Sequence, residues 1–157
     1  IKKDPLIKVY GPISFGIRTY DVMSKLPNHN GVYQIQLFQD SLEIFRLAMN
    51  RLTFRTTRFV NSLIDYHYYQ KNGKRIVRVQ VDSNNRLPEY KKVKNRGVVY
   101  LKDNMVHHFK FIVKDAYGNT AILPFRAMAV ANSLKVTDKK RETETKSVYF
   151  IHYKKAY

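Results

Sequence analysis

Histidine is the residue type in this chain that is best suited to metal chemistry, and it occurs at positions 29, 67, 107, 108 and 152. A zinc hydrolase needs ligands that converge on one ion, usually at the spacing H-x-H or H-E-x-x-H. Neither spacing occurs in the sequence. His107 and His108 are adjacent in a predicted strand, so their side chains point to opposite faces and cannot share one ion. The sequence therefore predicts no metal site.

Nucleophilic catalysis finds equally little support. The chain has no Cys and no G-x-S-x-G turn, and Ser14, Ser24 and Ser41 occupy strand or turn positions without a nearby His. The six glycines are scattered singly, so no glycine-rich loop is available to hold a phosphate. We expect no catalytic residue and no cofactor in this segment.

The stretch VKDAYGN (113–119) combines residue types that favour a tight turn. Asp115 can accept hydrogen bonds from backbone N–H groups, and Gly118 and Asn119 tolerate a positive φ. The flanking apolar runs then form a hairpin. Asp21 is expected to end one earlier strand, and Gly31 to open the next. We group Asp21, Gly31, Asp115, Gly118 and Asn119 as a structural turn motif.

Charge is the most pronounced feature of the composition. Lys and Arg number 29 against 12 Asp and Glu, which gives a net charge of +17. Such a protein attracts polyanions, including nucleic acid, anionic lipid headgroups and acidic cell-envelope polymers. The cations are spread along the whole chain, so a solvated basic surface is the simpler explanation.

The segment TTRFVNSLIDYHYYQKNG (56–73) differs from the rest of the chain, because its apolar residues follow helical spacing. It predicts a helix over about residues 56–70 that ends at Asn72-Gly73. Aromatic and basic side chains gather at the end of this helix, and they form a candidate binding surface: Tyr66, Tyr68, Tyr69, Lys71, Lys74 and Arg75. Solvation and packing at the helix end would explain the same residues. The sequence argues against nucleic acid as the ligand, since it contains no RNP-like motif, zinc finger or helix-turn-helix spacing.

Most of the remaining sequence alternates apolar and polar residues, as half-buried strands do. Examples are PISFGIRTYD (12–21) and GVYQIQLFQD (31–40), and similar runs cover residues 42–49, 75–81, 96–101, 106–115 and 120–130. The run at 96–101 is expected to form a hairpin with 106–115, and residues 82–95 a loop. Short strands separated by turns favour a mainly β protein, an immunoglobulin-like β-sandwich with one inserted helix.

Composition also suggests boundaries. Residues 1–9 are predicted to lead in from a preceding domain, because IKKDPLIKVY contains neither an initial Met nor a signal sequence. Residues 10–131 form the sandwich, the polar segment 132–146 is a linker, and 147–157 is the first strand of a truncated following domain. No run of 18 apolar residues occurs, so no transmembrane segment is predicted.

Six blocks of the sequence carry a resemblance to a known family. They are GPISFGIRTYD, NGVYQIQLFQDSLEIF, TRFVNSLIDY, NRLPEY, NRGVVYL and VKDAYGNTAILPF, all between about residues 10 and 125. In this order they resemble the noncatalytic immunoglobulin-like region that follows the peptidase domain in Gram-negative envelope lysostaphin-type zinc metallopeptidases. That family cleaves peptidoglycan cross-links with a zinc held by H-x-x-x-D and H-x-H motifs, and neither motif is present here.

The resemblance implies an accessory domain in the periplasm or at the outer membrane, with zinc only in an unseen peptidase domain. Its expected partners are other domains of the same chain or other envelope proteins. The alternative reading is a module that binds a polyanion such as a cell-wall polymer or lipopolysaccharide. Strong salt dependence would distinguish the alternative from apolar protein docking.

Overall fold

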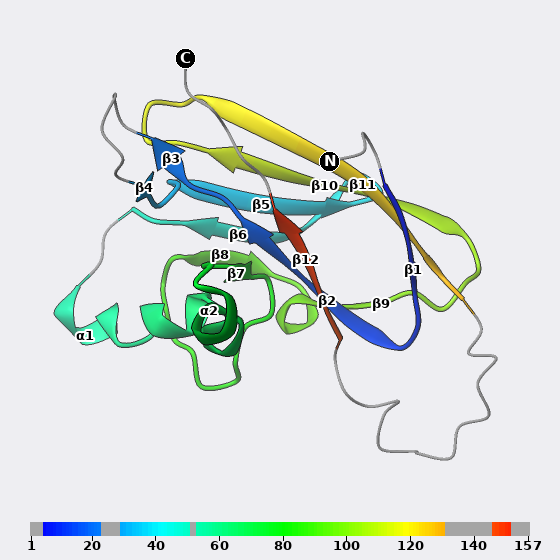
Figure 1. The fold of residues 1–157 in the computed structure, drawn as a ribbon, viewed down its shortest axis with the longest axis horizontal. Helices are drawn as coiled ribbons and strands as arrows, with labels where there is room; N and C mark the ends of the chain where they lie inside the picture. The colour runs from blue at the N-terminus through cyan, green and yellow to red at the C-terminus, as the bar shows by residue number, and fades with distance from the viewer. Residues whose placement is uncertain (1–4, 23–28, 51–52, 131–145, 152–157) are drawn as a thin grey trace.

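The computed structural model describes residues 5–22, 29–50, 53–130 and 146–151. Within these residues the protein is mainly β, as the sequence predicts, and strands make up 46% of the structure. Two sheets form the body of the molecule, and a group of short helical segments lies on one side of them next to β7 and β8 (Figure 1).

The larger sheet has six strands, and all its neighbouring strands are antiparallel except β1 and β11. β1 lies at one edge and β8 at the other. In spatial order the strands are β1 (Leu6–Val9), β11 (Thr120–Ala129), β10 (Val106–Lys114), β5 (Gln34–Gln39), β6 (Leu42–Ala48) and β8 (Tyr90–Val93).

The smaller sheet is built around β2 (Pro12–Arg18). β12 (Lys146–Ile151) pairs with β2 in parallel on one side. On its other side β2 pairs with β7 (Val77–Arg78) and with β9 (Val98–Tyr100) in antiparallel orientation. A separate short pair joins β3 (Asp21–Val22) to β4 (His29–Asn30).

Phenylalanine rings join the two sheets. Phe15 of β2 lies 5.0 Å from the ring centroid of Phe109 on β10 and 5.1 Å from that of Phe125 on β11. All three side chains are buried. Alternate residues of β10 and β11 point into this core, so the period-2 pattern in the sequence correctly identifies the buried face of these two strands.

The inserted helix lies where the sequence predicts it, but it is interrupted. Instead of one helix over 56–70, the structure has α1 (Phe54–Thr57), the 3₁₀ turn η1 (Val60–Leu63) and α2 (Tyr66–Asn72). The break falls at Ile64, which is extended and bridges to Val77. β-branched residues have low helix propensity, and this pairing outweighs their apolar periodicity.

Two strand expectations are corrected. The expected loop over 82–95 contains β8, whose Tyr90 and Val93 pair with β6, and it ends in the 3₁₀ turn η2 (Asn95–Gly97). The expected hairpin between 96–101 and 106–115 does not form, because β9 pairs with β2 of the other sheet. A turn signal shows where the chain reverses, but not which sheet receives the next strand.

The expected domain boundaries leave out two strands that the structure pairs with the sandwich. Residues 6–9 belong to β1, and residues 146–151 form β12 beside β2 (Figure 1). Both are added at sheet edges through backbone hydrogen bonds, which leave little trace in sequence composition. The expected linker, residues 132–146, lies outside the described residues except for its last one. The division into domains stays a prediction.

The turn at 115–119 has the chemistry that its sequence suggests. Oδ1 of Asp115 accepts the backbone N–H groups of Tyr117 (2.9 Å) and Asn119 (2.8 Å), and Oδ2 accepts the Asn119 side-chain amide (2.6 Å). Gly118 has a φ of 87°, whereas Asn119 does not adopt a positive φ. β10 and β11 pair on both sides of this turn along their full lengths. Asp21 lies in β3, and Gly31 directly follows β4.

Candidate functional site

The candidate binding surface lies on α2 and the residues that follow it. Helix α2 begins because the side chain of Asp65 accepts the N–H of Tyr68 at 2.8 Å. It ends at Gly73, whose left-handed φ of 63° directs its N–H to the carbonyl of Tyr69. Seven residues thus form a defined helix despite its short length. We call the six residues Tyr66, Tyr68, Tyr69, Lys71, Lys74 and Arg75 the insert surface.

A row of aromatic and cationic groups runs along the insert surface. The ring centroids of Tyr66 and Tyr69 lie 6.4 Å apart, as expected for side chains three residues apart on a helix. The guanidinium of Arg75 lies 5.6 Å from the centroid of Tyr69. Lys71 and Lys74 are exposed beside the row. Tyr66 is 60% exposed, whereas Tyr68 and Tyr69 are half-buried and also contribute to packing.

A hollow of about 780 Å³ adjoins Tyr66. The residues that line it come from η1, the start of α2, β7 and the segment after β7. The lining residues are Asn61, Ser62, Ile64, Asp65, Tyr66, His67, Arg78 and Asp82.

Arg78 anchors the back of this hollow. Its Nη2 donates to Asp82 at 2.8 Å and to the carbonyl oxygen of Ser62 at 3.0 Å, so it ties η1 to the smaller sheet. Burial raises the pKa of the nearby Tyr90 to about 12, which keeps its hydroxyl protonated at neutral pH. Arg78 and Asp82 form an ion pair on the wall of this hollow.

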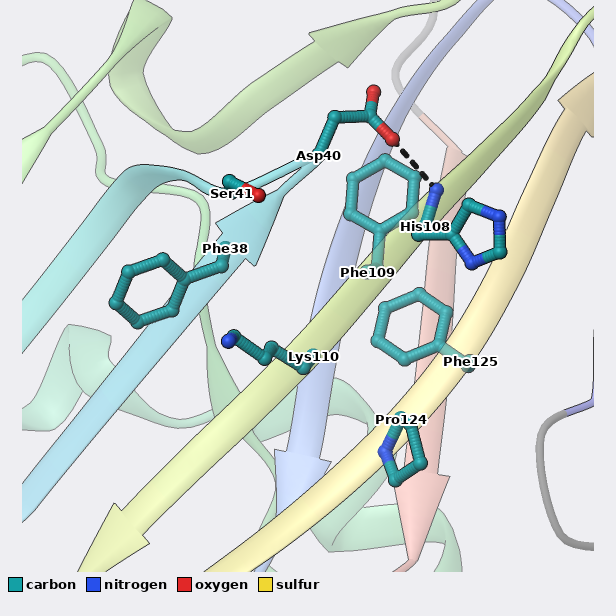
Figure 2. Close-up of a pocket in the computed structure, with 8 residues that line it drawn as sticks. All are labelled: Phe38, Asp40, Ser41, His108, Phe109, Lys110, Pro124 and Phe125. Atoms are coloured by element: carbon teal, nitrogen blue, oxygen red, sulfur yellow. Dashed lines mark hydrogen bonds between the residues drawn. The ribbon is translucent and has the colours of Figure 1, made fainter.

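A second hollow, of about 580 Å³, lies on the outward face of the six-stranded sheet (Figure 2). Phe38, Lys110 and Pro124 come from three neighbouring strands, and Asp40 and Ser41 from the turn between β5 and β6. The carboxylate of Asp40 accepts the backbone N–H of His108 at 2.8 Å. The Lys110 ammonium lies 5.1 Å from the ring centroid of Phe38. Sequence reasoning did not single out this face.

His107 is the most strongly bonded histidine among the described residues. Its Nδ1 lies 2.5 Å from Oδ2 of Asp40, and its Nε2 lies 2.7 Å from Oδ1 of Asp103. The hydrogen bonds to Asp40 and then to Asp103 raise the pKa of His107 above its ordinary 6.5. Because the two ring nitrogens face different carboxylates, the three groups do not converge on one point. Within the described residues no group of three or more such side chains could hold a metal ion.

No protein-family model and no curated protein sequence matches the chain. Across the residues that the structure describes, no helix combines the length and hydropathy needed to cross a membrane. Of the six residues of the insert surface, the structure brings Tyr66, Tyr69 and Arg75 into one row. It adds an outward sheet face that the sequence signals only through apolar residues on both faces of β10 and β11.

Proposed function

We propose that this chain is a noncatalytic interaction module that binds an acidic partner, either another domain of its own chain or another envelope protein. One observation carries this proposal: the fold uses its acidic side chains internally and leaves its cations on the surface. A module built in this way presents a positive field to its surroundings even where its cations are dispersed.

The acidic side chains have structural roles in the described part of the chain. Hydrogen bonds within the fold engage Asp40, Glu43, Asp65, Asp82, Asp103 and Asp115, and Glu89 is buried. Ion pairs between described residues involve Arg46, Lys92, Arg78 and His107 on the cationic side. The exposed cations outside these pairs include Lys71, Lys74, Arg75, Lys91, Lys94 and Lys102.

An immunoglobulin-like topology is part of the proposal. The spatial order β11-β10-β5-β6 corresponds to the order G-F-C-C′ of variable-type immunoglobulin sheets, and the core lies between two facing sheets. The six ordered sequence blocks support a parent protein of the lysostaphin-type metallopeptidase family. We therefore place the module in a bacterial cell envelope, next to a peptidase domain whose zinc would lie outside this segment.

The experiment distinguishes binding at the insert surface from attraction by the net charge of the whole protein. The probe is polyglutamate, titrated calorimetrically at about 50 and about 200 mM salt, where screening should weaken the binding markedly. One variant replaces Lys71, Lys74 and Arg75 by Ser, and the matched control replaces Lys91, Lys94 and Lys102 by Ser. We expect the first variant to lose more affinity than the control. Equal losses would show that only the total charge matters.

An anionic cell-wall polymer or lipopolysaccharide is the second candidate ligand, and the Tyr66–Tyr69–Arg75 row favours it. Exposed rings can lie flat on the apolar face of a sugar, while the neighbouring cations hold its acidic groups. We expect Tyr66→Ala to weaken the binding of an anionic polysaccharide several-fold and to leave polyglutamate binding unchanged. A similar effect on both ligands would remove the reason to prefer a saccharide.

A further inference from the structure

The outward face of the six-stranded sheet carries apolar residues where a sandwich normally exposes polar ones. In β10 the odd-numbered residues Phe109, Phe111 and Val113 are buried, so the even-numbered residues point outward. Ile112 is one of these, and its partner across the ladder is Ile122 of β11. Ile122 is 58% exposed.

Four apolar side chains form a patch on this face: Phe38, Ile112, Ile122 and Pro124. The strand register makes them neighbours, because Lys110 is paired with Pro124 on one side and with Phe38 on the other. The patch adjoins the hollow shown in Figure 2, where Phe38, Lys110 and Pro124 lie on adjacent strands. Contiguous apolar patches of this kind commonly mark interaction sites.

The net charge beside the patch is positive. Lys110 and Lys114 alternate with Ile112 along β10, and neither makes an ion pair with a described residue. Asp40 is the nearby carboxylate, and it is engaged with His107 and the backbone of His108.

On the other half of the same face, the polar side chains already form hydrogen bonds with one another. Gln34 donates to Gln36 at 2.7 Å, and Gln36 donates to Glu43 at 2.6 Å. Glu43 also accepts two hydrogen bonds from Arg46, and Lys92 lies 3.9 Å from it. This ladder leaves no unneutralised acid to attract a basic ligand. The rest of the sheet face is therefore apolar and cationic, with Lys110 between Phe38 and Pro124 and Lys114 next to Ile112 on the same face.

We propose that this sheet face docks an apolar protein surface that also carries acidic groups. The proposal rests on the acidic partner inferred above and specifies where such a partner would bind. A second copy of the chain fits poorly, because a two-fold contact would bring the lysines of one copy against the lysines of the other. An acidic partner instead neutralises Lys110 and Lys114 while it covers Ile112 and Ile122.

The test uses a synthetic amphipathic peptide with Leu along one helical face and Glu on both sides, and a second peptide with Lys in place of Glu. Isoleucine methyl NMR of the full chain reports the binding site. Ile112 and Ile122 report on the patch, whereas the buried Ile13, Ile17 and Ile35 serve as internal references. We expect the acidic peptide to shift the Ile112 and Ile122 signals and the basic peptide to leave them unchanged.

Two substitutions test the apolar centre of the patch. Ile122→Glu should weaken the acidic peptide by at least about tenfold, since it removes an apolar contact and adds a like charge. Leu42→Glu is the matched control, because Leu42 is an exposed aliphatic residue outside the patch, and it should change the affinity by less than about twofold. Lys110→Glu should weaken the binding of the acidic peptide and allow the basic peptide to bind.

The possible outcomes separate this inference from the proposed function. Equal binding of both peptides, or concentration-dependent shifts of Ile112 and Ile122 in the peptide-free chain, would overturn the acidic partner in favour of nonspecific contact or self-association. Polyglutamate binding at the insert surface without peptide binding at the sheet would refute the inference alone. Failure of both acidic probes would refute both proposals.

Discussion

Three glycines differ in how tightly the surrounding backbone constrains them. Gly97 has a φ of +79°, and a methyl group added there would lie 2.0 Å from the carbonyl oxygen of Val79. Gly118 has a φ of +87° but open space around it. Gly31 has neither a positive φ nor a neighbouring atom within 4 Å of an added methyl group. A substitution at each position therefore isolates a different physical cost.

We expect the three alanine variants to form a graded series. Gly97→Ala should lower the free energy of unfolding by about 3 kcal/mol or more, because steric overlap adds to the strain of the left-handed backbone. Gly118→Ala should cost about 1–2 kcal/mol from strain alone, and Gly31→Ala close to nothing. Urea denaturation measures all three. A Gly118→Ala variant as destabilised as Gly97→Ala would contradict the steric argument.

At the scale of elements, His107 holds three segments together. It lies on β10, Asp40 lies in the turn after β5, and Asp103 lies between β9 and β10. Burial raises the pKa of Asp40, but the hydrogen bonds from His107 and His108 outweigh it and leave that pKa below 3.8. The hydrogen bond from His107 lowers the pKa of Asp103 in the same way. All three shifts favour a protonated histidine between two carboxylates.

The pH dependence follows from these directions. The raised pKa of His107 gives stability that is complete below pH 6.5 and is lost as the pH rises through its folded-state pKa. The lowered pKa values of the two aspartates give stability that is lost as the pH falls below 3.8 through their folded-state values. The interaction should therefore contribute most between these limits.

We expect His107→Gln to reduce the melting temperature more at about pH 5.5 than at about pH 9. His67→Gln, an exposed substitution on α2 outside this group, is the control, and it should not reproduce the deficit of His107→Gln. Thermal unfolding monitored by circular dichroism across this range measures both. A deficit of His107→Gln that grows toward high pH would show that the proposed charge state is wrong.

Prediction from sequence worked where a local pattern decides the structure. The alternation of Phe109, Phe111 and Val113 with polar residues identified the core side of β10, and the turn residues at 115–119 located its hairpin. Prediction from sequence failed where pairing between residues far apart in the chain decides the structure. Nothing local to Val99 shows that β9 pairs with β2, and the lysines of β8 resemble a loop although they are typical of an edge strand.

The candidate sites show the same division. The insert surface was proposed from residues that are close in sequence, and it stays a prediction. The patch on the six-stranded sheet could not be proposed in this way, because Phe38, Ile112 and Ile122 become neighbours only through the pairing of β5, β10 and β11. Apolar residues at successive positions such as Phe111, Ile112 and Val113 were the available signal, and they read equally well as core.

At the scale of the whole molecule, Phe15 links the two sheets through its ring contacts with Phe109 and Phe125. We expect Phe15→Leu to lower the free energy of unfolding by about 2 kcal/mol, from lost buried area and imperfect filling of the space. Phe54→Leu is the control, because Phe54 is fully exposed and should tolerate the change.

The same Phe15→Leu variant tests the cooperativity. Urea unfolding followed by far-UV circular dichroism and by tyrosine fluorescence should give coincident transitions in the parent protein and in the variant. Two separated transitions would mean that each sheet unfolds independently and that the phenylalanine contacts do not couple them.

The parallel pairing of β1 with β11 also has a consequence for how the chain acquires its structure during synthesis. Leu6 is synthesised about 120 residues before its partner Arg126. At about 5–20 residues per second, that strand waits at least several seconds without its partner. β11 can pair with β10 immediately and leave its other edge open. β1 can therefore complete this sheet only after β11 has been made.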